Sequence, residues 1–293
     1  MRAGALLAWA VVALVGAAPA GAAVPRDGWG LGIADDSYLS PGSRIPDDFR
    51  ALGAKTFRLQ VHWNAACVPG RIESARDWIA QARQLGAEQI AVTFKKNPAV
   101  DCGDPAGCGL RPSETCYAAR IGEVVRALAP DVDVWGPANE PNLGDTWLPG
   151  TAGARLLAHY WVAFGAVLRA WDPSAQAISP EFADRSDLGS LAPYVNAYKA
   201  AGGGFGNYAG YHAYWGVHAM SRAPTDELAA LVPPEVPIWI TEVGAFGVNP
   251  GRAIADSDRE QARRVQWMLT APDGLASHPR VGRISYYHLQ ASP

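Results

Sequence analysis

Strand-like and helix-like segments alternate along almost the whole chain. Eight strand-like segments rich in β-branched and aromatic residues cover residues 29–34, 56–63, 89–94, 132–138, 175–179, 208–215, 237–243 and 283–289. Helix-like segments between them cover residues 45–52, 76–85, 113–128, 151–171, 188–200, 225–231 and 257–270. In the longest of these, Leu156, Tyr160, Phe164 and Leu168 recur every four residues and share one helix face. This alternation predicts an α/β fold, the (β/α)8 or TIM barrel.

The main alternative is an open, doubly wound sheet, which usually has a glycine-rich turn after its first strand. No such turn follows residues 29–34, so we expect the closed barrel. The sequence stops at Pro293, just past the eighth predicted strand, and the final helix is therefore predicted to be missing or reduced. Because there is no internal repeat or linker, residues 24–293 are expected to form a single domain.

The first residues have the pattern of a secretory signal. Arg2 supplies a positive start, residues 5–18 are apolar or small, and Ala20-Gly21-Ala22 offers a cleavage site. The apolar run is too short for a comfortable membrane span. We therefore predict a signal peptide over residues 1–23, with a mature protein that starts near Ala23 and is secreted.

The four cysteines lie close together in the sequence, at Cys67, Cys102, Cys108 and Cys116. An even number in an exported protein predicts two disulfides, for which three connectivities are open. We favour Cys102 with Cys108, which closes a small glycine-rich loop and leaves Cys67 for Cys116. A zinc site is disfavoured because no Cys-x-x-Cys spacing is present.

The composition excludes several partners. A net charge of -3 gives no electrostatic reason to expect binding to nucleic acid or to an anionic membrane. Eleven tryptophans are many for this length, and their flat faces suit either core packing or stacking on sugar rings. We expect no cofactor and no metal, and the sequence does not indicate an oligomeric state.

Polar residues cluster where the predicted strands end, which is the active-site rim of a barrel. Asn139 and Glu140 follow the fourth strand, and Glu242 ends the seventh. The remaining polar residues near strand ends are Asp35, Asp36, Arg58, His62, Asn64, Asn97, Glu181, His212, Tyr214 and His288. Two glutamates from separate strands are what hydrolysis of a glycosidic bond requires.

Two of these strand ends resemble a known group of enzymes. Asn139-Glu140-Pro141 and Thr241-Glu242-Val243-Gly244 are similar to the fourth and seventh strand motifs of clan A glycoside hydrolases, the 4/7 superfamily, which includes cellulase-like, xylanase-like and β-xylosidase-like enzymes. Arg58 on the second strand and His212-Ala213-Tyr214 on the sixth also match this clan. The resemblance extends over the whole predicted barrel.

The resemblance implies a retaining glycosidase that cleaves O-glycosidic bonds of a carbohydrate substrate. It implies that Glu140 is the general acid/base and Glu242 the nucleophile. Carboxyl groups about 5–5.5 Å apart leave no room for a water between them, so one must attack carbon directly. While Glu242 is ionised, its charge disfavours ionisation of Glu140, which therefore keeps a proton for the leaving oxygen.

The other matching residues are expected to bind substrate or support the nucleophile. Asn139 is expected to bind the sugar 2-hydroxyl, and Arg58 to hold Glu242 ionised and oriented. Tyr214 is expected to donate to Glu242, and His212 to a substrate hydroxyl. A structural ion pair for Arg58 and a core position for His212 stay open.

Two features depart from the clan pattern. Where the clan often has a tryptophan on the eighth strand, this chain has Ser285-Tyr286-Tyr287-His288, so Tyr286 or His288 would take its place. Glu181 is a third rim glutamate, expected to shape a loop rather than to bind substrate. Four aromatic residues could stack on sugars or seal the barrel: Trp63, Trp147, Trp215 and Phe246.

Two other functions stay open from the sequence. A non-catalytic carbohydrate-binding barrel would keep the fold without turnover. A metal-dependent barrel enzyme could use His62, His212 and His288, although no two of these histidines have the close spacing of a preformed ligand pair.

Overall fold

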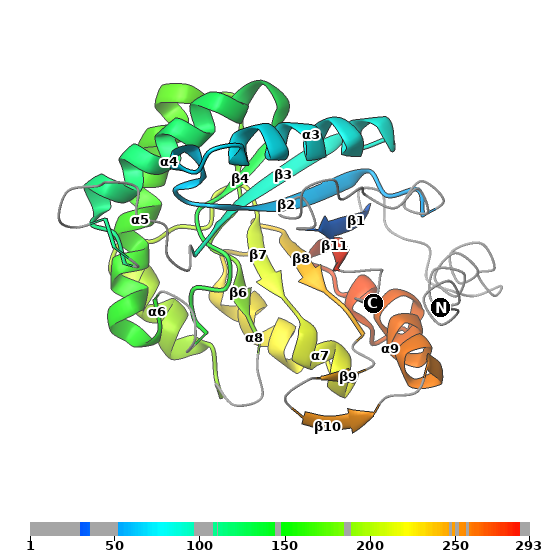
Figure 1. The fold of residues 1–293 in the computed structure, drawn as a ribbon. Coiled ribbons are helices and arrows are strands. Elements are labelled where there is room, and N and C mark those ends of the chain that lie inside the picture. The colour runs from blue at the N-terminus through cyan, green and yellow to red at the C-terminus, as the bar shows by residue number, and fades with distance from the viewer. Residues whose placement is uncertain are drawn as a thin grey trace.

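The computed structural model describes residues 30–35, 52–96, 108–109, 111–143, 148–184, 189–245, 248–249, 252–255 and 258–287. Within them, nine parallel strands form one curled sheet: β1 (Gly30–Asp35), β2 (Thr56–His62), β3 (Gln89–Lys95), β4 (Val134–Gly136), β5 (Gln176–Ala177), β6 (Phe182–Ala183), β7 (Ala209–His212), β8 (Ile238–Val243) and β11 (Val281–Tyr287). The strand order is β5-β4-β3-β2-β1-β11-β8-β7-β6. The strands that come first and last along the chain, β1 and β11, are neighbours in the sheet and pair with each other, as a barrel requires (Figure 1).

The two ends of this sheet, β5 and β6, are pieces of one segment. The backbone N–H of Ile178 donates to Trp135 in β4 at 2.9 Å, whereas that of Ser179 donates to Tyr208, next to β7, at 2.8 Å. Pro180 lacks an N–H group and interrupts the ladder at this point. The segment is therefore the fifth barrel strand, and counting it once gives eight strand positions. The predicted TIM-barrel fold is confirmed.

Helices cover the outside of the sheet (Figure 1). They are α3 (Arg71–Gln84), α4 (Glu114–Leu128), α5 (Gly150–Trp171), α6 (Ala192–Ala200), α7 (Tyr214–Ala219), α8 (Ala223–Leu231) and α9 (Asp258–Thr270). The predicted start of α4 is confirmed, because the Ser113 hydroxyl accepts from the backbone N–H of Cys116 at 3.2 Å. On α5, Tyr160 and Phe164 of the predicted stripe are fully buried. None of the described helices is long and apolar enough to cross a membrane.

Strand β2 shows how the barrel positions a site. Phe57 points outwards, where it packs edge-on against Trp78 of α3 at 6.3 Å between ring centroids. Because side chains alternate along a strand, Arg58 and Gln60 point to the other side, into the barrel. Both are buried although they are polar. A polar side chain buried in this way needs partners inside the barrel.

Some predicted boundaries are wrong. Helix α3 begins at Arg71 rather than at Arg76, and the strand predicted over 208–215 ends at His212. Tyr214 and Trp215 instead begin α7, because the Asp184 carboxylate accepts from two backbone N–H groups in its first turn at 2.8 Å each. The short antiparallel pair β9 (Val248–Asn249) and β10 (Arg252–Ala255) was not predicted.

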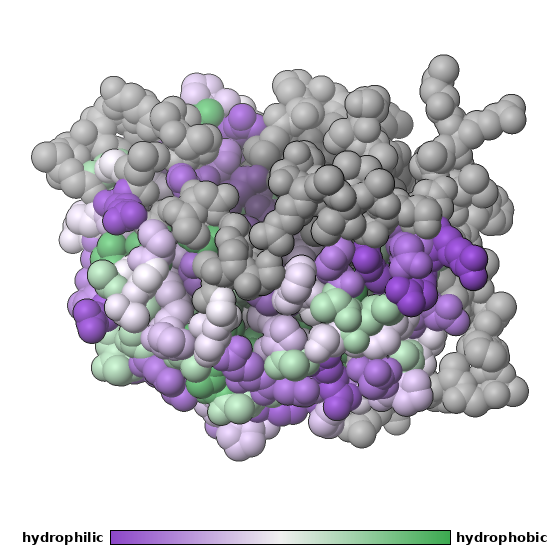
Figure 2. Space-filling model, turned by 90° about the horizontal axis from the view of Figure 1, so that it is seen from below, coloured by the Kyte–Doolittle hydropathy of each residue, from purple (hydrophilic) through white to green (hydrophobic). Residues whose placement is uncertain are grey.

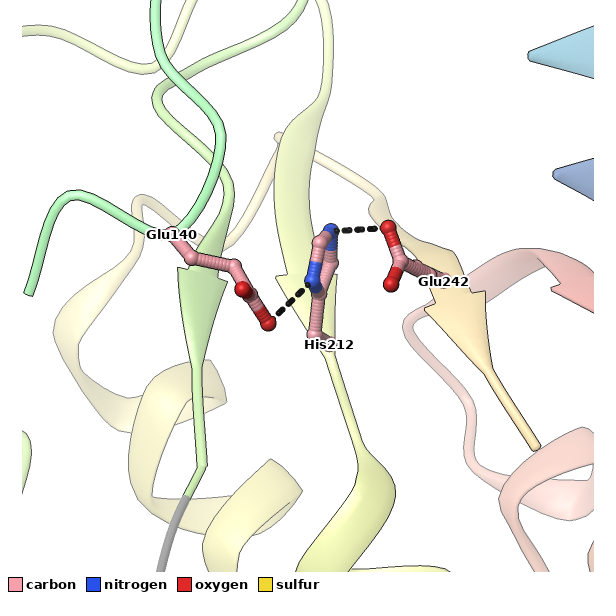
Figure 3. A group of neighbouring side chains, drawn as sticks. All are labelled: Glu140, His212 and Glu242. Atoms are coloured by element: carbon pink, nitrogen blue, oxygen red, sulfur yellow. Dashed lines mark hydrogen bonds and ion pairs between the residues drawn. The ribbon is translucent and has the colours of Figure 1, made fainter. Parts of the chain in front are cut away.

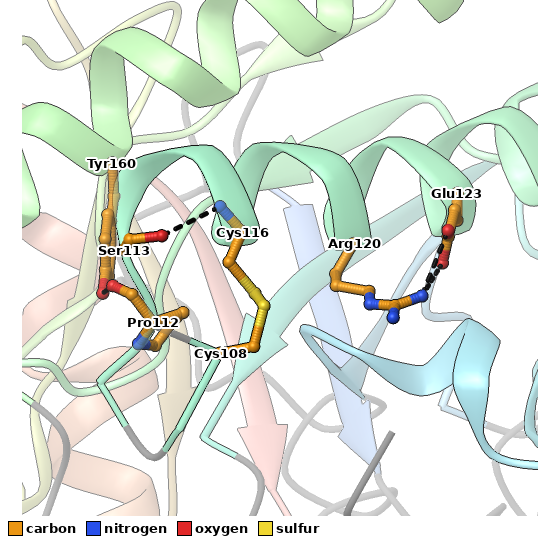
Figure 4. Close-up of a disulfide and its surroundings, with 7 residues drawn as sticks. All are labelled: Cys108, Pro112, Ser113, Cys116, Arg120, Glu123 and Tyr160. Atoms are coloured by element: carbon orange, nitrogen blue, oxygen red, sulfur yellow. Dashed lines mark hydrogen bonds and ion pairs between the residues drawn. A yellow bond between two sulfur atoms is a disulfide. The ribbon is translucent and has the colours of Figure 1, made fainter. Parts of the chain in front are cut away.

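The preferred disulfide pairing is also wrong. Cys108 is bonded to Cys116 in the first turn of α4, so neither Cys102–Cys108 nor Cys67–Cys116 can form (Figure 4). The Ser113 cap turns the start of α4 back towards the incoming chain, and this brings the two Cα atoms to 5.5 Å. Cys67 ends the 3-10 helix η2 (Ala65–Cys67).

Several predictions lie outside the described residues. They concern the signal peptide over 1–23, most of the helix over 45–52, Cys102, and the chain after Tyr287. Asp36, Asn97, Trp147, Phe246 and His288 lie outside the described residues as well.

Candidate active site

The carboxyl ends of the strands bring most of the predicted polar residues together. Arg58 comes from β2, Glu140 and Asn139 follow β4, His212 ends β7, and Glu242 lies near the end of β8. In a parallel barrel these strand ends lie at one rim.

Arg58 lies at the centre of this group and is 1% exposed. Its Nη1 donates to Glu242 Oε2 at 2.9 Å, and its Nη2 donates to Asn139 Oδ1 at 2.6 Å. Its Nε donates to Glu181 Oε1 at 2.9 Å, while Nη2 also donates to Glu181 Oε2. Burial alone would lower the pKa of Arg58, but the charges of Glu181 and Glu242 outweigh it and raise that pKa. Arg58 is therefore a fixed cation shared by two carboxylates.

Glu242 receives three hydrogen bonds. Its Oε1 accepts from the Tyr214 hydroxyl at 2.8 Å, and its Oε2 accepts from Arg58 and from Gln60 Nε2 at 2.7 Å. Burial, together with the charge of Glu242, raises the pKa of Tyr214 well above its usual value, so the hydroxyl keeps the proton that it donates. The donors predicted for Glu242, Arg58 and Tyr214, are both in contact with it.

Gln60 was not predicted as a site residue from the sequence. The alternation of side chains along a strand could have predicted it, since residue i+2 points to the same side as residue i. Gln60 follows Arg58 in this way and is 6% exposed.

Glu140 is more exposed than Glu242, with 22% of its side chain accessible against 8%. Its backbone has φ 45°, a left-handed conformation that is uncommon for residues other than glycine. The bond from its N–H to the carbonyl of Glu181, at 2.9 Å, helps to hold this turn. Such conformations are kept at functional sites when the surrounding structure imposes them.

His212 lies between the two glutamates (Figure 3). Its Nδ1 is 3.0 Å from Glu140 Oε1, and its Nε2 is 3.8 Å from Glu242 Oε2 and 3.4 Å from Arg58 Nη2. Burial alone would lower the pKa of His212, but the charge of Glu242 and the hydrogen bonds to Glu140 and Glu181 raise it to about 10. The ring is fully buried and faces protein groups, so this geometry does not support the expected bond to a substrate hydroxyl.

The spacing of Glu140, His212 and Glu242 would also suit a metal ion, because one ligand atom from each lies within 4.8 Å of the others. The contacts already present argue against such a site. His212 Nδ1 is 3.0 Å from Glu140 Oε1, and Glu242 Oε2 accepts from Arg58 and Gln60. A metal ion would have to displace these bonds, and it would lie beside the positive charge of Arg58. The same spacing places an oxygen of Glu140 within 4.8 Å of an oxygen of Glu242.

Glu181 neither shapes a surface loop nor faces solvent. It is fully buried, and it pairs with Arg58 and accepts from the Thr93 hydroxyl at 2.9 Å. Burial alone would raise the pKa of Glu181, but the charge of Arg58 lowers it to about 2. The carboxylate is therefore ionised at neutral pH.

The three aromatic residues predicted to bind sugar lie in different environments. Trp63 is 2% exposed within the hydrophobic core. Tyr286 is 4% exposed, and its hydroxyl accepts from the backbone N–H of Ala245 at 3.3 Å. Trp215 is 36% exposed and stacks on His218. Exposed large hydrophobic side chains are rare among the described residues, and on the face drawn in Figure 2 hydrophobic residues are scattered rather than gathered in one broad patch.

A cavity of about 550 Å³ lies beside Trp215. It is lined by residues at the starts of α5, α6 and α8, by Asp184, and by Asn142, two positions after Glu140. Burial raises the pKa of Asp184 to about 6, although the N–H groups of Gly216 and Trp215 oppose this shift. The cavity therefore combines an aromatic face with hydrogen-bonding groups near the ends of β4, β6 and β7.

Comparison with solved structures identifies glycoside hydrolases with the same architecture. A GH53 catalytic domain from Ignisphaera aggregans aligns with TM-score 0.64 and 14% identity over 92% of this chain and 88% of that one. A GH128 (subgroup II) endo-β-1,3-glucanase from Pseudomonas viridiflava aligns with TM-score 0.55 and 19% identity over 90% and 88%. A GH5_18 protein from Streptomyces cattleya, in complex with GlcNAc, aligns with TM-score 0.61 and 16% identity over 88% and 70%.

Comparisons at the level of the whole sequence find no relative: no protein-family model matches the chain, and a search of curated proteins finds no match. At identities of 14% to 19%, the structural likeness concerns the fold. The chain thus has the TIM-barrel fold of clan A glycoside hydrolases, the group that its strand-end glutamates resemble.

Proposed function

We propose that this protein is a retaining glycoside hydrolase that cleaves O-glycosidic bonds of a poly- or oligosaccharide. The observation that carries this proposal is the short separation, within 4.8 Å, between a carboxylate oxygen of Glu140, which follows β4, and one of Glu242 in β8. Retaining enzymes have close carboxyl pairs, whereas inverting enzymes need room for a water between them. The glycoside hydrolase fold supports the same class of reaction.

In the first step, a Glu242 oxygen attacks the anomeric carbon while Glu140 gives its proton to the departing oxygen. The glycosidic C–O bond breaks, one saccharide leaves as an alcohol, and the other is esterified to Glu242. In the second step, Glu140 takes a proton from water, whose oxygen attacks the same carbon and releases Glu242. One water is consumed, and two inversions retain the configuration.

The neighbouring residues suit these roles. Three donors fix both oxygens of Glu242, so one lone pair can be aimed at the sugar without reorganisation. Asn139 accepts from Arg58 through Oδ1, which turns its amide nitrogen away from Arg58 and leaves it to donate to the sugar 2-hydroxyl. The greater exposure of Glu140 suits a group that must meet both a leaving group and water.

We place the leaving saccharide on the Glu140 side, over the exposed face of Trp215 and into the adjoining cavity. A flat indole suits a sugar ring, and the cavity has hydrogen-bonding groups for hydroxyls. Tyr286 would border the opposite side, as the substitute for the missing tryptophan. Secretion through the signal peptide over residues 1–23 is part of the proposal, and the Cys108–Cys116 disulfide suits that compartment.

The test begins with the wild-type protein and a panel of plant, fungal and bacterial cell-wall glycans, followed by aryl glycosides of the sugar that responds. Glu140→Gln is expected to lose about 10²–10⁴-fold in turnover of the natural glycan. Glu242→Ala should be inactive, and azide should restore turnover and yield a glycosyl azide of opposite anomeric configuration to the substrate.

Other outcomes would contradict the proposal. Rescue by azide in Glu181→Ala but not in Glu242→Ala would move the nucleophile to the fifth strand position. A wild-type protein that binds a glycan without cleaving it would be a non-catalytic barrel. Turnover abolished by a chelator and restored by a metal ion would favour a metal-dependent enzyme.

A further inference from the structure

Glu181 is a buried carboxylate that the double displacement does not use. It is fully buried, is ionised, and contacts Arg58 rather than any position open to substrate. A buried charge without a role is costly to keep, so its contacts indicate what it does.

Glu181 occupies one edge of the Arg58 guanidinium group. Its two oxygens accept from Nε and Nη2, which is the planar, two-bonded arrangement that arginine forms with carboxylates. The second N–H of Nη2 is directed to Asn139, and Nη1 alone reaches Glu242. Arg58 is thus bidentate to Glu181 and makes a single bond to Glu242.

We propose that Glu181 is a positioning residue that holds Arg58 by one edge, so that Arg58 makes only one bond to the nucleophile Glu242. This inference rests on the proposed function. Without Glu181, the guanidinium group would be free to turn and form a bidentate pair with Glu242. That pair would engage both oxygens of Glu242 and make it a weaker nucleophile. The hydrogen bond from Arg58 to Asn139 would be lost.

Neighbouring residues of the barrel hold Glu181 in this place. Its N–H donates to Ala138 at 2.8 Å and its carbonyl accepts from Glu140, so the residue is anchored beside both Asn139 and Glu140. On β7, Gly210 leaves space for its side chain, because a Cβ there would lie 2.7 Å from Glu181 Cγ. The Thr93 hydroxyl adds a bond at 2.9 Å.

The test compares Glu181→Gln and Glu181→Asp with Asp172→Asn as the matched control, on an aryl glycoside. Asp172 is likewise a buried carboxylate, but it accepts from Trp135 Nε1 at 2.9 Å and contacts none of the site residues. In Asp172→Asn kcat/KM should therefore stay within about threefold, a factor that corresponds to well under 1 kcal/mol. Glu181→Gln should lose about 10²-fold in kcat/KM, the size expected for a small misplacement of a catalytic group. KM should change much less than kcat.

The pH profile separates positioning from a purely structural role. The charged or titratable groups that face Glu242 are Arg58, Tyr214, His212 and Glu140. In Glu181→Gln, Arg58 is released towards Glu242, so the acid limb of kcat/KM should move to lower pH. A structural defect would lower the active fraction and leave the limb where it is.

Glu181→Asp keeps the charge, so it should fold and keep the limb near its wild-type position with a smaller loss of kcat/KM. The inference is overturned if Glu181→Gln keeps wild-type kcat/KM. It is also overturned if Glu181→Gln loses activity while the acid limb of its pH profile stays at the wild-type position. If Glu181→Gln does not fold, wild-type kcat/KM in Glu181→Asp overturns it. Azide rescue of Glu242→Ala tests the proposed function independently, so the two failures are distinguishable.

Discussion

Replacement of Arg58 by methionine tests the charge balance of the site most directly. Methionine keeps much of the length of the side chain and removes its charge. Glu181 and Glu242 are 1% and 8% exposed and both depend on Arg58 as their cation. Removing one partner of a buried ion pair costs about 3–5 kcal/mol, because the other charge stays buried and unpaired.

This loss is large relative to the free energy of unfolding of a whole domain. Domains unfold with a free energy of about 5–15 kcal/mol, so the variant should lose a fifth or more of its stability. At about 2–4 °C per kcal/mol for domains of around 200 residues, the melting temperature should fall by roughly 6–20 °C. Arg58→Lys keeps the charge but loses the two-bonded geometry, so it should lie between wild type and Arg58→Met.

The difference in stability between the wild type and Arg58→Met should change with pH in one direction. In the wild type, the pKa of Glu181 is lowered from 4.5 to about 2, so its stabilising contribution is present above about pH 4.5 and is lost as pH falls towards 2. In Arg58→Met the charge of Arg58 no longer offsets burial, and His212 alone still lowers the pKa of Glu181. That pKa should therefore lie above its wild-type value, so the folded variant binds a proton at higher pH than the wild type. The difference between the proteins should therefore shrink towards acid pH.

Urea denaturation followed by tryptophan fluorescence at about pH 7.5 and pH 4 measures this difference. A loss below about 1 kcal/mol at pH 7.5 would refute the claim that Arg58 compensates two buried charges. A difference that grows towards pH 4 would refute the assignment of that cost to the carboxylates.

Three further predictions concern the nucleophile, the barrel interior and the disulfide. Tyr214→Phe removes a donor to Glu242 at 2.8 Å and should lower kcat/KM by about tenfold or more, the equivalent of a lost bond to a charged group, in steady-state assays. In Gly136→Ala a Cβ would lie 2.7 Å from Thr93 Oγ1 and 2.9 Å from Ile178 Cγ2, so urea denaturation should show a loss of about 1–3 kcal/mol. Gly109→Ala, where the Cβ meets no atom of the described residues within 4 Å, is its control and should be neutral. Cys108→Ser should lower stability by about 2–4 kcal/mol, and a reductant should bring the wild type towards the variant in the same assay.

The alternation of segments and the strand-end glutamates were readable from the sequence. Hydrophobic periodicity is local, so it predicts elements without knowledge of their partners. Because parallel strands in a barrel end at one rim, residues as distant as Glu140 and Glu242 could be expected to meet. The contact of Tyr214 with Glu242 follows from the same rule, although Tyr214 lies in a helix rather than a strand.

The contacts that organise the site were decided by the tertiary structure. Arg58 and Glu181 are 123 positions apart, and their pairing depends on how β3 and β4 place β2 relative to the interrupted fifth strand. The disulfide to Cys116 likewise depends on how the Ser113 cap turns the chain, and the start of α7 depends on a carboxylate from another segment, Asp184. Sequence periodicity shows which side of an element is buried. Only the packed barrel determines which buried charges face each other, because that depends on distances set by every strand between them.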